Sequence, residues 1–280
     1  FRNYGEFVVP EGGGRGGATV PRGYTGVKPF LRSHTNPEYP AFDLNITDQR
    51  RADIWIADFK GFVATGVMPQ LQILRLPNDH TSGARADAPS PKAQVADNDL
   101  ALGRIVEAVS RSPFWKNTVI FVVEDDAQNG SDHVDSHRAP ALIISAYNKP
   151  GVYHRFINTT DFIATMERVL KLGALSQFDF FGRPVTEIFG PSADLRPYAA
   201  LTPAQPLNPG DSLYFLRNTD ESTLRVKATV VRVLFLTNRP DENLSQTLKE
   251  IQPKLQFTEE QFNHWSVKKN FGQSKKTFDQ

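Results

Sequence analysis

Three stretches of the chain place apolar residues at intervals of three and four, which is the spacing of an amphipathic helix. The first stretch, residues 47–66, ends at a glycine, and its apolar positions are Ile54, Phe59, Phe62 and Val63. The second, residues 95–111, stops before Pro113 and carries Leu102, Ile105, Val106 and Val109. The third follows a capping residue at Asn158 or Thr159, reaches Gly173, and carries Phe162, Ile163, Met166, Val169 and Leu170. We predict a helix over each stretch.

Three short runs between these stretches have the composition of β-strands. Residues 71–76 are partly β-rich and end abruptly at Pro77. Residues 118–123 are almost wholly β-branched or aromatic, as in a strand buried on both faces of a parallel sheet, and residues 141–145 predict a second buried strand. Strands that alternate with helices predict an α/β protein with a doubly wound, mostly parallel sheet and helices on both faces.

The two ends of the chain carry weaker signals. Residues 1–45 are rich in glycine, proline and charge, and we interpret them as surface loops. The glycine run at 11–17 lacks both a preceding strand and the Gly-Lys-Ser/Thr ending of a phosphate cradle, so a flexible loop is the better interpretation. One strand is predicted within residues 224–236. We predict a domain over residues 1–208 and a divergent tail of unassigned role over residues 209–280.

Composition narrows the possible partners. The 32 basic and 31 acidic side chains nearly cancel, so no long-range field selects nucleic acid or an anionic membrane, and a small-molecule substrate is favoured. No apolar run approaches the roughly 20 residues that span a bilayer. The chain contains no cysteine, which excludes disulfides and thiolate metal sites, so any metal must be bound by histidine and carboxylate groups.

Two polar clusters follow predicted strands, where the loops of an open α/β sheet converge. Asp79 and His80 follow the strand at 71–76, and a run of acidic and histidine residues over 124–137 follows the strand at 118–123. Neighbouring carboxylates such as Asp125 and Asp126 repel each other and lose hydration there, unless a cation or hydrogen-bond donors offset the cost. Imidazole with carboxylate suits Zn or Mn, and carboxylates alone suit Mg or Ca. We therefore predict a divalent metal site.

Other interpretations of these residues remain open. Asp125 and Asp126 could form an exposed turn or a helix cap, and His133 and His137 could be ordinary surface residues that share a face only if their loop is helical. The two aspartates could also work with His133 as a general acid and base without metal. His154 has no neighbouring carboxylate cluster in the sequence, which favours a structural or exposed role.

These motifs resemble those of a known family. Residues 125–134, Asp-Asp-Ala-Gln-Asn-Gly-Ser-Asp-His-Val, are similar without a gap to the Asp-Glu-His-Gly-Gly-x-x-Asp-His-Val element of the phospholipase C and acid phosphatase-type phosphoesterases. They are closer still to alkaline phosphatase-like proteins often fused to a β-propeller, whose pattern continues through Asp135, His137 and Arg138. Residues 76–81 resemble the other metal-ligand loop of that group. Residues 2–6 resemble a stretch just after its nucleophile.

The resemblance covers about residues 1–208 and implies a role for each matching residue. Asp125 and Asp126 would bind the metal ion that also contacts the nucleophile. Asp79, His80 and His137 would bind a second ion or orient the leaving group. His133 would contact substrate or act as an acid or base, so the expected catalytic residues are His133 and His137 and the expected substrate-binding residues are Asp132 and His133.

The resemblance further implies a metal-dependent phosphoesterase of the alkaline phosphatase superfamily, with one or two ions of Zn, Mn, Ca or Mg. It places the Ser or Thr nucleophile upstream of Arg2, so the expected fold is incomplete at its N-terminus and the chain alone is expected to turn over poorly or not at all. Residues 127–129 replace the His-Gly-Gly of the phospholipase C branch, which favours small phosphate esters over lipids. A β-propeller in the parent protein and a periplasmic or secreted location are also implied. The alternative function is a non-catalytic metal- or partner-binding module.

Overall fold

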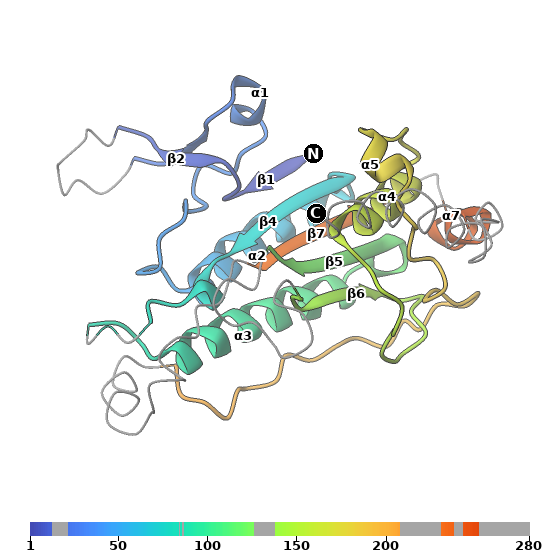
Figure 1. Ribbon diagram of the computed structural model, residues 1–280. Helices are drawn as coiled ribbons and strands as arrows, with labels where there is room; N and C mark the ends of the chain where they lie inside the picture. The colour runs from blue at the N-terminus through green and yellow to red at the C-terminus, as the bar shows by residue number, and fades with distance from the viewer. Residues whose placement is uncertain are drawn as a thin grey trace, which may run out of the picture. The chain divides into compact units, whose positions relative to one another are not determined.

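A computed structural model describes residues 1–12, 22–83, 85, 87–125, 138–207, 231–237 and 243–251 of the 280-residue chain. The chain divides into two compact units, Phe1–Tyr153 with Ile188–Ser245 and His154–Glu187 with Gln246–Gln280. The first unit is built around a five-stranded sheet in the order β1-β4-β7-β5-β6 (Figure 1). Its strands are β1 (Arg2–Tyr4), β4 (Leu71–Leu76), β7 (Val231–Thr237), β5 (Thr118–Glu124) and β6 (Ala141–Ser145).

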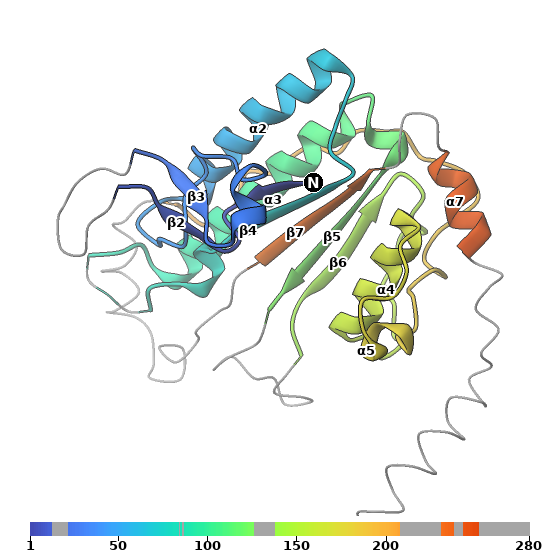
Figure 2. The same cartoon turned by 90° about the horizontal axis from the view of Figure 1, so that it is seen from above.

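The directions of these strands make the sheet mixed. β1 and β4 are parallel, whereas the pairs β4–β7, β7–β5 and β5–β6 are antiparallel. The predicted α/β class is confirmed, but the expectation of a mostly parallel sheet is corrected. The strands β4 and β5 do run in the same direction, as predicted for a strand-helix-strand unit, but β7 lies between them in the opposite direction (Figure 2).

The strand β6 also departs from its prediction. It forms over residues 141–145 as expected, but it lies at the edge of the sheet and is antiparallel to β5. Ala141 and Leu142 are exposed, so this strand is not buried along its length. An apolar run of five residues does not by itself distinguish an edge strand from a central one.

Two long helices of the first unit form where the apolar spacing predicted them. The helix α2 (Asp48–Thr65) starts at Thr47, whose side chain accepts a hydrogen bond from the backbone N–H of Arg50, and ends at Gly66 with a φ of 70°. The helix α3 (Pro91–Ser110) begins four residues before the predicted Val95. Ser90 caps it, and a proline in the first turn costs no hydrogen bond, so the apolar stripe alone underestimated its length.

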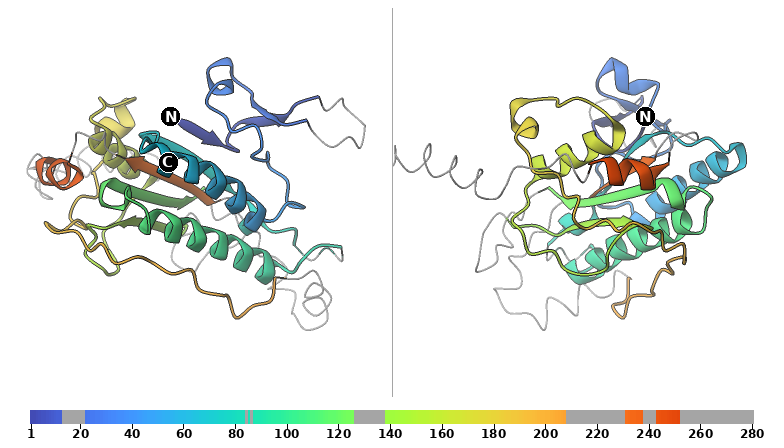
Figure 3. Two further views of the ribbon diagram at one scale, coloured as in Figure 1. Left: turned by 180° about the vertical axis from the view of Figure 1, so that it is seen from behind. Right: turned by 90° about the vertical axis from the view of Figure 1, so that its right-hand side faces the viewer.

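The helices α2 and α3 lie side by side on one face of the sheet (Figure 3, left). Trp55 of α2 is fully buried and stacks on Phe59 at 4.8 Å and on Phe235 of β7 at 5.0 Å between ring centroids. Its indole N–H donates to the side-chain oxygen of Gln72 in β4 at 3.2 Å. Burial of each such side chain stabilises the fold by about 1.5–3 kcal/mol. The contacts of Trp55 therefore fix α2 against both β4 and β7.

The expectation of surface loops throughout residues 1–45 is wrong for the described part of this stretch, whereas the loop predicted at the glycine run falls mostly on residues 13–21, which lie outside the described residues. This stretch contains β1, the antiparallel pair β2 (Val8–Pro10) and β3 (Tyr24–Gly26), and the short helix α1 (Pro29–Arg32). Tyr4 and Tyr39 are both fully buried and pack edge to face at 5.5 Å. Gly5 has a φ of 91°, and a Cβ at this position would lie only 3.0 Å from the ring of Tyr39. Strands of three residues are too short to produce a detectable apolar period.

Polar contacts hold this N-terminal segment to α2. The carboxylate of Asp58 accepts hydrogen bonds from the guanidinium of Arg2 at 2.9 Å, from the hydroxyl of Tyr4 at 2.8 Å and from the amide of Asn36 at 3.0 Å. These donors come from β1 and from the loop that follows α1. A carboxylate with several donors, one of them charged, fixes the position of β1 although β1 is short.

The second unit contains α4 (Thr159–Leu170) and α5 (Gln177–Phe180). Asn158 and Asp161 form a reciprocal capping box at the start of α4, which confirms Asn158 as its cap. The helix ends at Leu170, before the predicted stop at Gly173, and Lys171, with a φ of 56°, is its C-cap. Ser176 and Asp179 form a second capping box on α5.

Two further helices lie in the described part of the chain. The single-turn helix η2 (Trp115–Asn117) leads into β5, and α7 is Leu244–Ile251. The strand predicted within residues 224–236 is found as β7, a central strand of the sheet. The predicted domain boundary at residue 208 falls between described ranges and stays a prediction. None of the described helices is long and apolar enough to cross a membrane.

Candidate functional site

The carboxyl ends of β4 and β5 meet at one edge of the sheet. In the strand register, Leu76 at the end of β4 and Glu124 at the end of β5 both pair with Val231 of β7. One intervening strand separates them, which corresponds to about 10 Å at the usual spacing of about 4.8 Å between neighbouring strands. The prediction that the two polar clusters emerge at the same edge is therefore confirmed for the residues that directly follow each strand.

A single-turn helix, η1 (Asn78–His80), follows β4 at this edge and carries two predicted site residues. Asp79 is only 4% exposed, and His80 is half-buried. Pro77 ends the strand, and the backbone N–H of His80 then donates to its carbonyl at 3.1 Å. The tight turn directs a carboxylate and an imidazole from neighbouring positions to the end of one strand.

The ring of His80 is fixed by two contacts. Its Nδ1 lies 3.1 Å from the backbone carbonyl of Thr81. A carbonyl can only accept, so Nδ1 carries a proton, and in the neutral ring Nε2 then holds the lone pair. The ring also packs edge to face against Phe42 at 5.4 Å. His80 is therefore held in the tautomer and orientation that leave Nε2 able to bind a cation or accept a proton.

The backbone just after His80 is strained. Thr81 has a φ of 57° and a ψ of 159°, in a region that β-branched residues avoid and glycine alone adopts freely. Such a conformation costs on the order of 1–3 kcal/mol and persists only where surrounding contacts enforce it. Thr81 is buried, and its N–H donates to the carbonyl of Asn78 at 3.1 Å. The strain keeps the carbonyl of Thr81 within reach of His80.

A network of buried polar side chains holds the η1 turn in place. Asn98 of α3 donates from its side-chain amide to Asp48 at 3.0 Å, to the carbonyl of Leu76 at 3.1 Å and to Asp79 at 3.4 Å. The backbone N–H of Asn78 donates to the same carboxylate oxygen of Asp48 at 2.9 Å. The first turn of α2 and the first half of α3 therefore both hold the η1 turn in place.

Asp97 and Arg51 also belong to this network, and the charges of both act on Asp48. Asp97 of α3 accepts the backbone N–H of Asp48 at 2.6 Å and the side-chain amide of Asn78 at 2.6 Å, so it also caps the start of α2. Arg51 pairs with Asp48 at 3.3 Å, and both side chains are at most 1% exposed. Burial raises the pKa of Asp48 to about 7, and Asp97 adds to that rise, while Arg51 and the amide donors oppose it.

The residues of this network were not predicted from the sequence. Asp48, Arg51, Asp97 and Asn98 lie at positions of α2 and α3 that face inward, where the helical pattern leads one to expect apolar side chains. Projecting each predicted helix onto a wheel would have shown polar residues inside the apolar stripe, which is a detectable signal. What no single sequence reveals is that the two helices bring these residues together beneath one turn.

The other predicted site residues are only partly covered. Asp125 is exposed directly after β5, at the same edge as the η1 turn. Asp126, Asp132, His133 and His137 lie outside the described residues, so their predicted roles stay predictions. Within the described ranges no three His, Asp or Glu side chains gather closely enough to hold a metal ion, so Asp79 and His80 supply at most part of a ligand set. His154 is exposed, in line with its prediction.

Comparison with known proteins gives one match. A family model described as the Phosphoesterase family matches residues 15–173, which is more than half of the chain. The matched range includes the η1 turn, the supporting residues of α2 and α3, and both flanks of residues 126–137. No curated protein and no solved structure matches the chain.

Proposed function

The chain belongs to the phosphoesterase family, and from that premise we propose that it forms the metal-binding part of a hydrolase acting on phosphate esters. The observation that carries this proposal is the shared edge of β4 and β5, where a buried aspartate and an oriented histidine lie two strands away from Asp125. Carboxylate and imidazole are the ligands expected there, because the chain has no cysteine.

Asp79 and His80 fit a divalent cation in three respects. Asp79 is almost fully buried, and Asn98 orients one of its oxygens. His80 donates its Nδ1 proton to a carbonyl, which is the usual outer contact of a metal-bound histidine and raises the basicity of the ligating nitrogen. The side-chain amide oxygen of Asn78, which directly precedes them, is buried and accepts no hydrogen bond from the part of the chain that the structure describes. Further ligands are needed, and we propose Asp125, Asp126 and His137.

The proposed reaction transfers a phosphoryl group in two displacements. A Ser or Thr nucleophile, which the family resemblance places before Arg2, attacks phosphorus as the bond to the leaving alcohol breaks, and water then hydrolyses the phospho-enzyme to inorganic phosphate. One or two ions of Zn, Mn, Ca or Mg would polarise the phosphoryl oxygens and stabilise the leaving oxygen. We propose that His133 or His137 transfers the proton to the leaving alcohol and that Asp132 and His133 bind the substrate.

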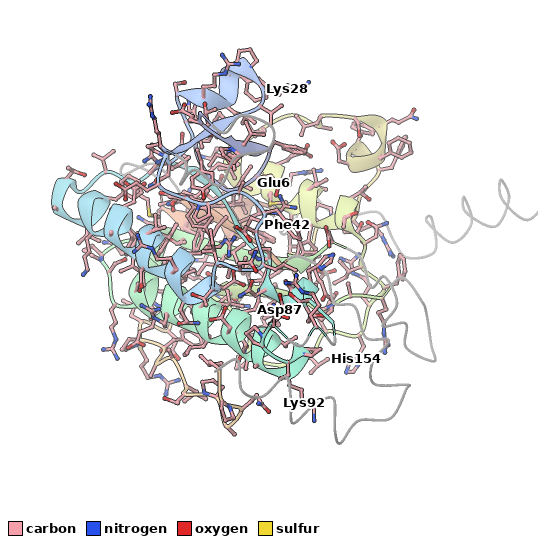
Figure 4. The ribbon with its side chains drawn as sticks, turned by 90° about the vertical axis from the view of Figure 1, so that its left-hand side faces the viewer. Glu6, Lys28, Phe42, Asp87, Lys92 and His154 are labelled. Atoms are coloured by element: carbon pink, nitrogen blue, oxygen red, sulfur yellow. The ribbon has the colours of Figure 1, made fainter. Side chains whose placement is uncertain are left out.

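The first test measures metal content and hydrolysis together. The full-length gene product is purified, its metals are determined by elemental analysis, and p-nitrophenyl phosphate hydrolysis is followed before and after chelation and after metal is restored. Asp79→Asn and His80→Ala should each lower the bound metal and reduce kcat/KM by about 100-fold or more. The matched controls Asp87→Asn and His154→Ala change exposed residues, which Figure 4 labels, and should leave both quantities unchanged.

Four outcomes are informative. Loss of metal and activity in the two site variants alone supports the proposal. Bound metal without hydrolysis by the full-length product indicates a non-catalytic metal-binding module. Full activity in ion-free protein refutes the metal site, whereas brisk metal-dependent turnover by the 280-residue chain alone refutes the placement of the nucleophile before Arg2.

A further inference from the structure

Phe42 lies against the candidate site and is nevertheless exposed. It belongs to the loop between α1 and α2 (Figure 4), and its ring packs edge to face against His80 with 5.4 Å between ring centroids. The guanidinium of Arg75, near the end of β4, lies 5.2 Å from the centre of the same ring. In spite of these two neighbours, 43% of the surface of Phe42 is open. An aromatic surface of this kind beside a candidate ligand is available to a bound molecule.

The loop that carries Phe42 is held firmly from inside the protein. The buried guanidinium of Arg51 donates to the carbonyls of Ala41 and Asp43, on either side of Phe42, at 3.0 Å each. A third bond from Arg51 reaches the carbonyl of Ile46 at 2.5 Å. The loop thus surrounds the buried guanidinium of Arg51, and Phe42 occupies a defined position on the outside of the loop.

The same cation is connected to the turn that carries His80. Arg51 pairs with Asp48, and Asp48 accepts the backbone N–H of Asn78, which opens the η1 turn. One buried ion pair therefore sets the positions of both Phe42 and His80. A side chain that is already ordered loses little freedom when a ligand packs against it, so the contact costs less than one on a loose loop.

A purely structural role does not account for the exposure of this ring. Tyr39, three residues earlier on the same loop, is fully buried, and its hydroxyl donates to the carbonyl of Arg75 at 2.7 Å. That residue already anchors the loop to β4. Phe42 adds no buried area of comparable size, yet it presents an apolar face next to the imidazole that we assign to the phosphate site. Exposed apolar surface beside a polar site is a common feature of ligand-binding positions.

We propose that Phe42 contacts the organic group of the ester and selects substrates whose leaving alcohol is aromatic. This inference rests on the proposed function. With the phosphoryl group bound beside His80, the alcohol part extends from it, and a planar ring can pack on the open face of Phe42 in an offset or edge-to-face arrangement. A small aliphatic alcohol has too little surface to gain from that contact.

The test compares two substrates in variants of the full-length gene product. For Phe42→Ala, kcat/KM with phenyl phosphate should fall about 3- to 10-fold, mainly through KM, and kcat/KM with ethyl phosphate should change by less than about 2-fold. Phe42→Tyr keeps the ring and should retain the wild-type preference. Phe30→Ala removes an exposed aromatic side chain from α1 and should change neither value.

The outcomes separate this inference from the proposed function. An equal loss with both substrates would show that Phe42 only supports His80, which overturns the inference and leaves the phosphoesterase assignment intact. If the metal-loaded wild-type protein hydrolyses neither phenyl phosphate nor ethyl phosphate, the inference and the proposed function are both overturned. If Phe42→Ala unfolds at a lower urea concentration than wild type, Phe42→Leu, which keeps an apolar side chain without a ring, decides by the same substrate ratio.

Discussion

Replacing Asp48 by asparagine is expected to remove a loss of stability that the protein undergoes between pH 5 and pH 8. Asp48 is fully buried, and its folded-state pKa is raised from 3.8 to about 7, first by burial and then by the nearby carboxylate of Asp97. A carboxyl group with a raised folded-state pKa favours the folded protein at low pH, where it is protonated in both states. That advantage is lost as pH rises through the folded-state pKa.

The size of the effect follows from the shift. A difference of about three pKa units corresponds to on the order of 4 kcal/mol over the whole titration, at about 1.4 kcal/mol per unit. Between pH 5 and the folded-state pKa about two of these units are traversed, so the wild-type protein should lose about 3 kcal/mol of unfolding free energy. Asparagine resembles the protonated acid in shape and stays neutral, so the Asp48→Asn variant should lack this loss.

The assay is urea unfolding followed by tryptophan fluorescence at pH 5, 6, 7 and 8 for both proteins. Other titrating groups are common to the two, so the difference between their unfolding free energies isolates Asp48. The unfolding free energy of the variant, compared with that of the wild type, should be higher at pH 8 than at pH 5. If the difference between the two proteins stays constant within about 0.5 kcal/mol over this range, Asp48 does not titrate as its burial implies, and Arg51 with the amide donors keeps it ionised.

Three other predictions concern the supports of the site and the second unit. Asn98→Ala removes donors to a buried carboxylate and a buried carbonyl and should cost about 2–4 kcal/mol in urea unfolding, whereas the exposed control Asn45→Ala should cost less than about 0.5 kcal/mol. Thr81→Gly relieves the strained φ and should raise the thermal midpoint, and a lower midpoint would contradict the strain. Hydrogen bonding by Ser176 lowers the pKa of Asp179 to about 2, so its stabilising effect is present above the ordinary pKa of 3.8 and is lost as pH falls toward 2. Ser176→Ala should raise the pKa of Asp179 in an NMR titration, and an unchanged value would show that the hydroxyl is not its main partner.

The elements that sequence could predict are those whose own residues determine them. The helix over 48–65 has an apolar stripe, a threonine cap and a terminal glycine, and the strand over 118–124 is apolar at every position between Thr118 and Glu124. Each signal is local, so no knowledge of the partner was needed. The parallel direction of β4 and β5 also followed, because a helix joins them.

The order of strands could not be predicted in this way. The strand β7 follows β5 by more than a hundred residues and enters the sheet between β4 and β5. Its composition indicates a buried strand but carries no information on its neighbours. Pairing is decided by side chains that meet only in the folded protein, such as Phe235 against Trp55. The same limit applies to Phe42 and His80, which are 38 residues apart in sequence and touch only after folding.

The Asp48–Arg51 pair suggests why charged residues occupy the buried face of α2. An apolar pair of the same volume could make the fold as stable or more stable, since burying two charges is costly. It could not, however, accept the N–H of Asn78 and donate to the carbonyls of Ala41 and Asp43 at the same time. Those backbone groups belong to the two segments that carry His80 and Phe42. The polar pair therefore fixes the spacing between these segments at some cost in stability. Variants of Arg51 should disturb the site under conditions in which the sheet stays folded.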